Sequence, residues 1–115
     1  FPSLQVMMDS TLFTNYINKL IEINTFCVKR DIKLIIVPYP EFDKFSMFVT
    51  AEFINKFLCN KISQQGINCF NIYPALKNAK LNNYTVNSSD NHINTQASKI
   101  VADTLSKYIR TYLKE

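Results

Sequence analysis

The sequence holds very little glycine, with Gly66 alone in 115 residues. A chain of this length and average composition holds roughly eight. The glycine-built loops that hold a nucleophile or an oxyanion in many enzymes are therefore not visible here. The chain can carry part of such an active site, but it does not carry all of one.

The sequence also lacks long apolar runs and clusters of positive charge. No stretch approaches the roughly 20 apolar residues of a membrane-spanning helix. The lysines are scattered without runs, and the net charge of +4 is small. Neither a membrane span nor a nucleic-acid partner is expected. Since 47% of the residues are hydrophobic and 19% charged, the chain is expected to fold around a core.

Cysteines are few and do not follow a metal-binding pattern. Cys27, Cys59 and Cys69 form no CxxC pair and no ligand spacing with His92. Each stands in an apolar periodic stretch, where buried free thiols are common. We expect free cysteines and neither a metal nor an organic cofactor, with one disulfide left open if the protein is exported.

Apolar residues at helical spacing predict three helices, at 11–30, 49–65 and 95–113. The last has the clearest amphipathic pattern. The residues expected to face inward are Phe13, Tyr16, Ile17, Leu20, Ile23 and Cys27 in the first, Phe53, Ile54, Phe57, Leu58 and Ile62 in the second, and Ala97, Val101, Leu105, Tyr108, Ile109 and Tyr112 in the third.

Capping residues stand next to these helices. Asp9 or Ser10 before the first helix and Asn94 before the last are expected to accept hydrogen bonds from free backbone N–H groups. Gly66 after the second helix is expected to end it in a left-handed conformation.

Two apolar runs, 33–37 and 67–72, predict strands, and prolines close the first of them. The order helix–strand–helix–strand–helix indicates an α/β fold with a parallel sheet, part of a three-layer flavodoxin-like sandwich. Two strands alone leave most edges of such a sheet uncovered. Residues 1–115 are therefore expected to be the C-terminal portion of a single domain, completed by an N-terminal part that precedes Phe1.

The long connection 73–93 leaves the carboxyl end of the second expected strand, where parallel sheets bind ligands, and a short helical turn is expected at 74–77. It ends in Asp90-Asn91-His92, with the only histidine of the chain. Histidine exchanges protons near neutral pH, and a carboxylate bonded to one ring nitrogen leaves the other as a base. This is the supporting half of a nucleophile–histidine–carboxylate triad. The alternative is a polar turn that caps the last helix.

The run from Ile67 onward, INCFNIYPALKNAK…SSDNHINTQASKIVADTLSKYI, resembles the closing segment of SGNH/GDSL-type hydrolases and acyltransferases. In that family a last strand, a loop, an Asp–His motif and an amphipathic helix follow one another. The Asp-x-His spacing is closer to the polysaccharide O-acetyltransferases related to the alginate-acetylation proteins than to the commoner Asp-x-x-His hydrolases. Residues 24–41 resemble the helix–strand unit that comes before.

By this resemblance, His92 is the general base that activates a serine, Asp90 orients it, and the substrate is an ester or an acylated carbohydrate. The chain departs from the family in having no Gly-Asp-Ser, no glycine for an oxyanion hole and no Gly-x-Asn-Asp block. The serine is thus expected upstream of Phe1 or in another chain. Asp9-Ser10 is the alternative as a degenerate nucleophile motif, although capping explains this pair more simply.

Two other interpretations remain open. A non-catalytic SGNH-like module could bind a glycan or a protein through the long loop, and the glycine scarcity favours it. A flavodoxin-like or receiver-type domain is the weaker alternative, because no acidic cluster stands at the early strand ends.

Overall fold

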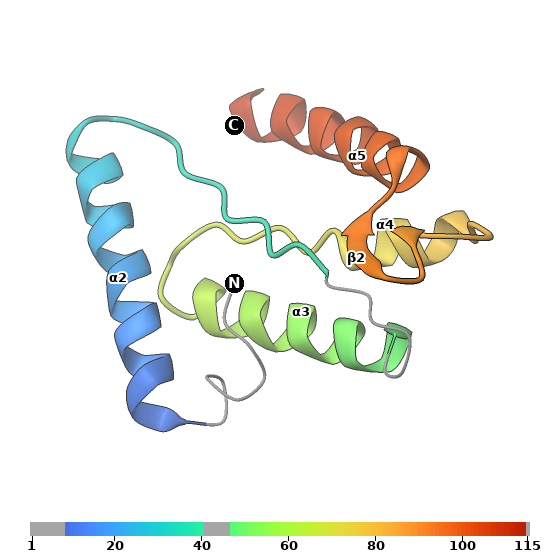
Figure 1. Cartoon of the computed structure of the whole chain (residues 1–115). Helices are drawn as coiled ribbons and strands as arrows, with labels where there is room; N and C mark the ends of the chain where they lie inside the picture. Colours follow the sequence, from blue (N-terminus) through green and yellow to red (C-terminus); the bar gives the residue numbers. More distant parts are fainter. Residues whose placement is uncertain (1–8, 41–46, 115) are drawn as a thin grey trace. The chain divides into compact units, whose positions relative to one another are not determined.

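A computed structural model describes residues 9–40 and 47–114 (Figure 1). In these ranges the chain forms helices and one short hairpin. The prediction of helices near 11–30, 49–65 and 95–113 is confirmed, and the turn expected at 74–77 is a longer helix. The elements are α2 (Ser10–Lys29), α3 (Met47–Ser63), α4 (Tyr73–Ala79), β1 (Thr85–Asn87), β2 (Asp90–Ile93) and α5 (Thr95–Lys114).

The described residues divide into two compact units. Residues 9–38 and 56–70 form the first, with α2 and the C-terminal half of α3. Residues 39–40, 47–55 and 71–114 form the second, with the rest of α3, α4, the hairpin and α5. The candidate site lies in the second unit.

The prediction of a three-layer parallel sandwich is wrong. The runs 33–37 and 67–72 do meet in parallel, but only through one bridge, between Ile36 and Cys69. A single bridge does not make a pair of strands, and within the described ranges no third strand lies beside these two runs. The strands that do form, β1 and β2, are antiparallel and local. The described chain is therefore mostly helical.

The start of α2 is held by the side chain of Asp9. Its Oδ1 accepts hydrogen bonds from the backbone N–H groups of Thr11 and Leu12, each at 3.0 Å. Ser10 is the first residue of the helix. The capping prediction for Asp9 is confirmed, and it explains the Asp9-Ser10 pair without any chemistry.

Left-handed residues follow three of the described helices. Asp31 after α2 has φ 56°, Gly66 after α3 has φ 75°, and Lys80 after α4 has φ 51°. Glycine adopts this conformation without strain, whereas in other residues it costs about 1 kcal/mol of conformational energy. Because the chain has one glycine, an aspartate and a lysine end the other two helices.

The buried side chains of the first unit come mainly from the C-terminal half of α3. Leu58 and Ile62 are fully buried, and the ring centroids of Phe13 and Phe57 lie 5.5 Å apart. Ile23, expected to face inward, is instead exposed, so that prediction is wrong.

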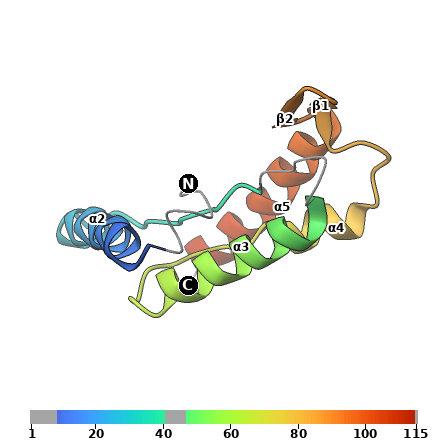
Figure 2. The same cartoon turned by 60° about the horizontal axis from the view of Figure 1, so that its bottom comes forward.

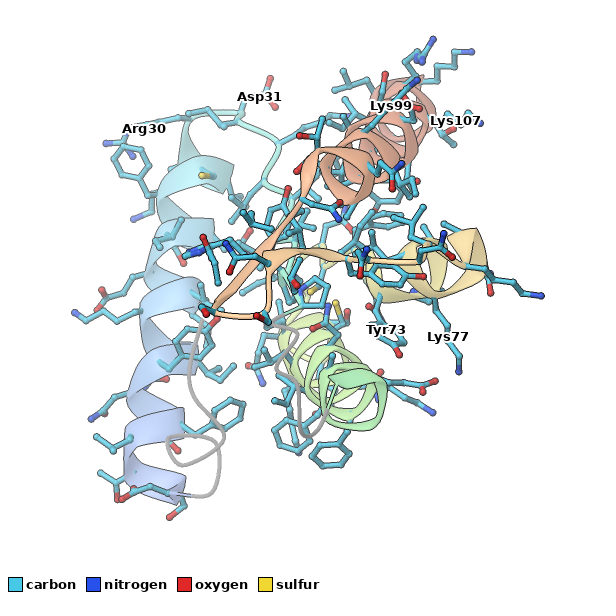
Figure 3. The ribbon with its side chains drawn as sticks, turned by 45° about the vertical axis from the view of Figure 1, so that its right-hand side comes forward. Arg30, Asp31, Tyr73, Lys77, Lys99 and Lys107 are labelled. Carbon is cyan, nitrogen blue, oxygen red and sulfur yellow. The ribbon has the colours of Figure 1, made fainter. Side chains whose placement is uncertain are left out.

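In the second unit, α4 packs against α5 (Figure 2). Its buried side chains include Ala51, Asn55, Ile72, Tyr73, Leu76, Ala97 and Val101. Phe53 and Ile109, both expected to face inward, are exposed, so these predictions are also wrong. Figure 3 shows Tyr73 and Lys77 on α4 and Lys99 and Lys107 on α5.

Of the helices in the described ranges, none combines the length and the apolar character that crossing a membrane requires.

Candidate Asp–His site

A β-bulge carries the histidine. Strands β1 and β2 pair antiparallel, with Thr85 opposite Ile93 and Asn87 opposite Asp90. One residue separates the paired positions on β1 and two separate those on β2, so the register shifts between them. The two residues of such a bulge oppose a single residue of the partner strand, which re-aims their side chains. His92 is one of the two.

Asp90 holds His92 by two contacts of the same oxygen. Its Oδ1 accepts the backbone N–H of His92 at 2.9 Å, and the imidazole Nδ1 lies 2.6 Å from the same atom. The first contact is an Asx turn, in which an aspartate bonds the backbone two residues onward. This turn brings the carboxylate to the ring, so the hydrogen bond expected from the Asp-x-His spacing is present.

The two contacts also favour the ionised form of Asp90. The backbone N–H of His92, and after it the imidazole, lower the pKa of the Asp90 carboxyl. A hydrogen bond to the charged form favours ionisation. The carboxylate is thus ionised at neutral pH and accepts the Nδ1 proton of the ring.

This arrangement leaves Nε2 as the basic nitrogen of a neutral imidazole. Within the described ranges the ring hydrogen-bonds to Asp90 alone. The side chain of His92 is 92% exposed and that of Asp90 is 42% exposed. The basic nitrogen is open to a substrate or to another protein group.

Tyr84 ties the chain before the hairpin to α4. Its hydroxyl donates to the carbonyl of Leu76 at 2.7 Å and accepts from the N–H of Leu81 at 3.1 Å. The hydroxyl thereby satisfies one of the carbonyls that the end of a helix leaves free. The approach to β1 is fixed against α4.

Asn94 closes the hairpin and starts α5. Its Oδ1 accepts the N–H of Ala97 at 2.9 Å, so the predicted N-cap is confirmed. Its Nδ2 donates to the carbonyls of Asn83 at 2.7 Å and Thr85 at 3.3 Å. Asn94, rather than Asp90, caps the helix, and the same amide joins the two ends of the hairpin. The sequence pattern indicated the cap but not the bonds across the hairpin.

Replacing Asn94 by alanine is expected to lower the free energy of unfolding by about 1–2 kcal/mol, because a cap and two cross-hairpin bonds are lost. Asn94→Asp keeps the cap but cannot donate to the two carbonyls, so it is also expected to destabilise. Urea denaturation measures both variants. Asn82→Ala, at an exposed position in the preceding loop, is the matched control. Wild-type stability of Asn94→Asp would contradict the role of the cross-hairpin bonds.

The hairpin itself was missed by the sequence prediction, which took 73–93 as a long connection with one short helical turn at 74–77. Its signal was the turn-forming run Asn87-Ser88-Ser89-Asp90 between the β-branched pair Thr85-Val86 and Ile93. Over the described ranges, no three His, Cys, Asp or Glu side chains gather where they could hold a metal ion.

Comparison with protein-family models, curated proteins and solved structures finds no match to this chain. The resemblance to SGNH-type hydrolases and acyltransferases stays a prediction, as does the expected place of residues 1–115 at the end of one domain.

Proposed function

We propose that this chain supplies the histidine and the carboxylate of a serine-dependent ester hydrolase or O-acyltransferase. His92 is the general base, Asp90 is the positioning residue, and the acyl group is an acetyl carried by a carbohydrate. The observation that carries the proposal is the 2.6 Å contact between Asp90 Oδ1 and His92 Nδ1 beneath an exposed Nε2. The resemblance of the segment from Ile67 onward supports the same chemistry.

The proton transfers follow from this contact. Nε2 takes the proton of the serine hydroxyl as the serine oxygen bonds to the acyl carbon. The ester C–O bond then breaks, and the departing alcohol receives the proton from Nε2. Water, or the hydroxyl of an acceptor, repeats the two steps in the second half of the reaction and releases the serine.

The serine belongs outside the described residues of this chain, or to another chain. Within the described ranges, no hydrogen bond of the imidazole reaches a serine. A nucleophile from outside is compatible with the exposure of His92, which leaves room for the approaching hydroxyl.

Replacing Asp90 by asparagine tests the proposal. The kcat for an acetyl ester is expected to fall about 10- to 100-fold, because the amide no longer favours the Nδ1–H tautomer. The fall is smaller than for a buried carboxylate, since water competes for a side chain that is 42% exposed. Turnover of p-nitrophenyl acetate and of an acetylated oligosaccharide by the intact protein measures kcat.

Nitrogen NMR of the imidazole shows whether Asp90 orients His92 or only stabilises the hairpin, because it reports which ring nitrogen carries the proton. In the wild type the proton is expected on Nδ1, and in Asp90→Asn the Nε2–H tautomer is expected to appear. Asp103→Asn makes the same substitution at an exposed position of α5 and is expected to change neither reading. Equal kcat values for Asp90→Asn and the wild type would overturn the role of Asp90.

A further inference from the structure

The chain reverses direction after α3 and brings two cysteines together. The N–H of Gln65 donates to the Ile62 carbonyl at 3.0 Å, and the N–H of Gly66 donates to the Ser63 carbonyl at 3.0 Å. Gly66 then turns the backbone with its left-handed φ of 75°. Residues 67–70 therefore run back beside the C-terminal half of α3 (Figure 1).

Cys69 is fixed in this returning segment. The N–H of Ile36 donates to the Asn68 carbonyl at 2.8 Å, and the N–H of Phe70 donates to the Ile36 carbonyl at 2.8 Å. These bonds flank Cys69 on both sides and hold its backbone in the single parallel bridge. The position of Cys69 is thus set by backbone pairing.

Cys59 faces it from α3. Cys59 is in the helix and only 8% exposed, and a hydrogen bond with the other thiol is the largest influence on the pKa of both Cys59 and Cys69. Tyr16 of α2 lies near the pair, where burial raises its pKa to about 12. A disulfide forms where the backbone already brings two thiols together, as the helix and the bridged segment do here.

We propose that Cys59 and Cys69 are a redox-active pair that closes an intramolecular disulfide when a peroxide reaches the protein. The proposal does not depend on the ester chemistry of the second unit. It identifies which two of the three thiols pair.

The reaction balances with hydrogen peroxide as the oxidant. The Cys59 thiolate attacks one peroxide oxygen, the O–O bond breaks, and Cys59 becomes a sulfenic acid while hydroxide leaves. The Cys69 sulfur then attacks the Cys59 sulfur, the S–O bond breaks, and a second hydroxide leaves. The two thiol protons join the two hydroxides as water. Two thiols are oxidised and one peroxide is reduced.

The interaction between the thiols favours the thiolate form of Cys59. It lowers the pKa of Cys59, whose thiolate accepts the bond, and raises the pKa of Cys69, which donates it. The thiolate is the reactive form of cysteine. In the proposed step Cys59 attacks the peroxide and Cys69 resolves the sulfenic acid.

The bond would lock the returning segment to α3. It closes a loop of 11 residues, 59–69, which restricts the unfolded chain. The melting temperature of the oxidised protein is expected to be on the order of 10 °C higher than that of the reduced protein.

Peptide mapping tests the pairing. The folded, reduced protein is treated with hydrogen peroxide, its remaining thiols are alkylated after denaturation, and linked peptides are identified by mass. The expected product joins Cys59 to Cys69, leaves Cys27 alkylated and reverts with dithiothreitol. Bond formation is expected to be at least about tenfold slower in urea, where the fold no longer holds the thiols together.

Single substitutions supply the controls. Cys27→Ser is expected to form the bond and to show the same increase in melting temperature on oxidation. Cys59→Ser and Cys69→Ser are expected to show neither the bond nor the increase. The proposal is overturned if the wild type yields Cys59 and Cys69 as separate alkylated or sulfonic-acid residues, if Cys27 enters the bond, or if the rate in urea equals that of the folded protein.

Discussion

Replacing His92 by alanine is expected to lower the kcat for an acetyl ester by about 1,000-fold or more. The chain has no other histidine that could take the serine proton. Because the side chain is 92% exposed, its removal is expected to change the free energy of unfolding by less than about 0.5 kcal/mol. Initial rates on p-nitrophenyl acetate, with circular dichroism of the same samples, measure both.

Two controls make this result specific. Lys99→Ala removes an exposed side chain of α5 in the same unit (Figure 3) and is expected to leave the rate unchanged. Free imidazole is expected to restore part of the activity of His92→Ala, since solvent reaches the place that the ring occupied.

An undiminished rate in His92→Ala would rule out this histidine as the base. The alternative of a non-catalytic module that binds a glycan or a protein would then be favoured. In that case His92→Ala would leave turnover unchanged and weaken the binding of the glycan, as measured by titration. The same variant therefore separates the two functions.

Replacing Leu76 by alanine is expected to lower the free energy of unfolding by about 2–5 kcal/mol. This side chain is fully buried in the second unit. Helix α4 has only 7 residues, and a helix that short has no stability of its own without packing. The Leu76 carbonyl also accepts the Tyr84 hydroxyl, so loosening α4 is expected to loosen the approach to the hairpin.

Leu113→Ala is the matched control for this loss. It makes the same substitution on α5, where the side chain is 60% exposed, and is expected to change stability by less than about 0.5 kcal/mol. Urea denaturation measures both variants. A loss for Leu76→Ala no larger than that for Leu113→Ala would show that α4 does not depend on this side chain.

Helices were predictable because the residues that form them lie close together in the sequence. Apolar periodicity located α2, α3 and α5, and the caps at Asp9 and Asn94 follow from side chains two or three residues away. Which face is buried was less predictable. Ile23 and Phe53 fit the periodic patterns and are exposed, because burial depends on what packs against a helix.

The sheet was not predictable for the opposite reason. The runs 33–37 and 67–72 have the composition of strands, but a strand also needs a partner segment to share its backbone hydrogen bonds. Ile36 and Cys69 form one parallel bridge, and no described segment extends the pairing. The composition of a single segment cannot reveal whether that partner exists.

The sequence by itself determined the Asp90–His92 pair, since an Asx turn needs only residues two apart, and it determined most helix positions and caps. With its single glycine, the sequence likewise shows no glycine-built nucleophile loop. Only the tertiary structure decided that His92 lies exposed in a bulge, that Asn94 joins the ends of the hairpin, and that Cys59 meets Cys69. Those features depend on where the chain turns back on itself, which is set by packing and hydrogen bonds between segments apart in the sequence.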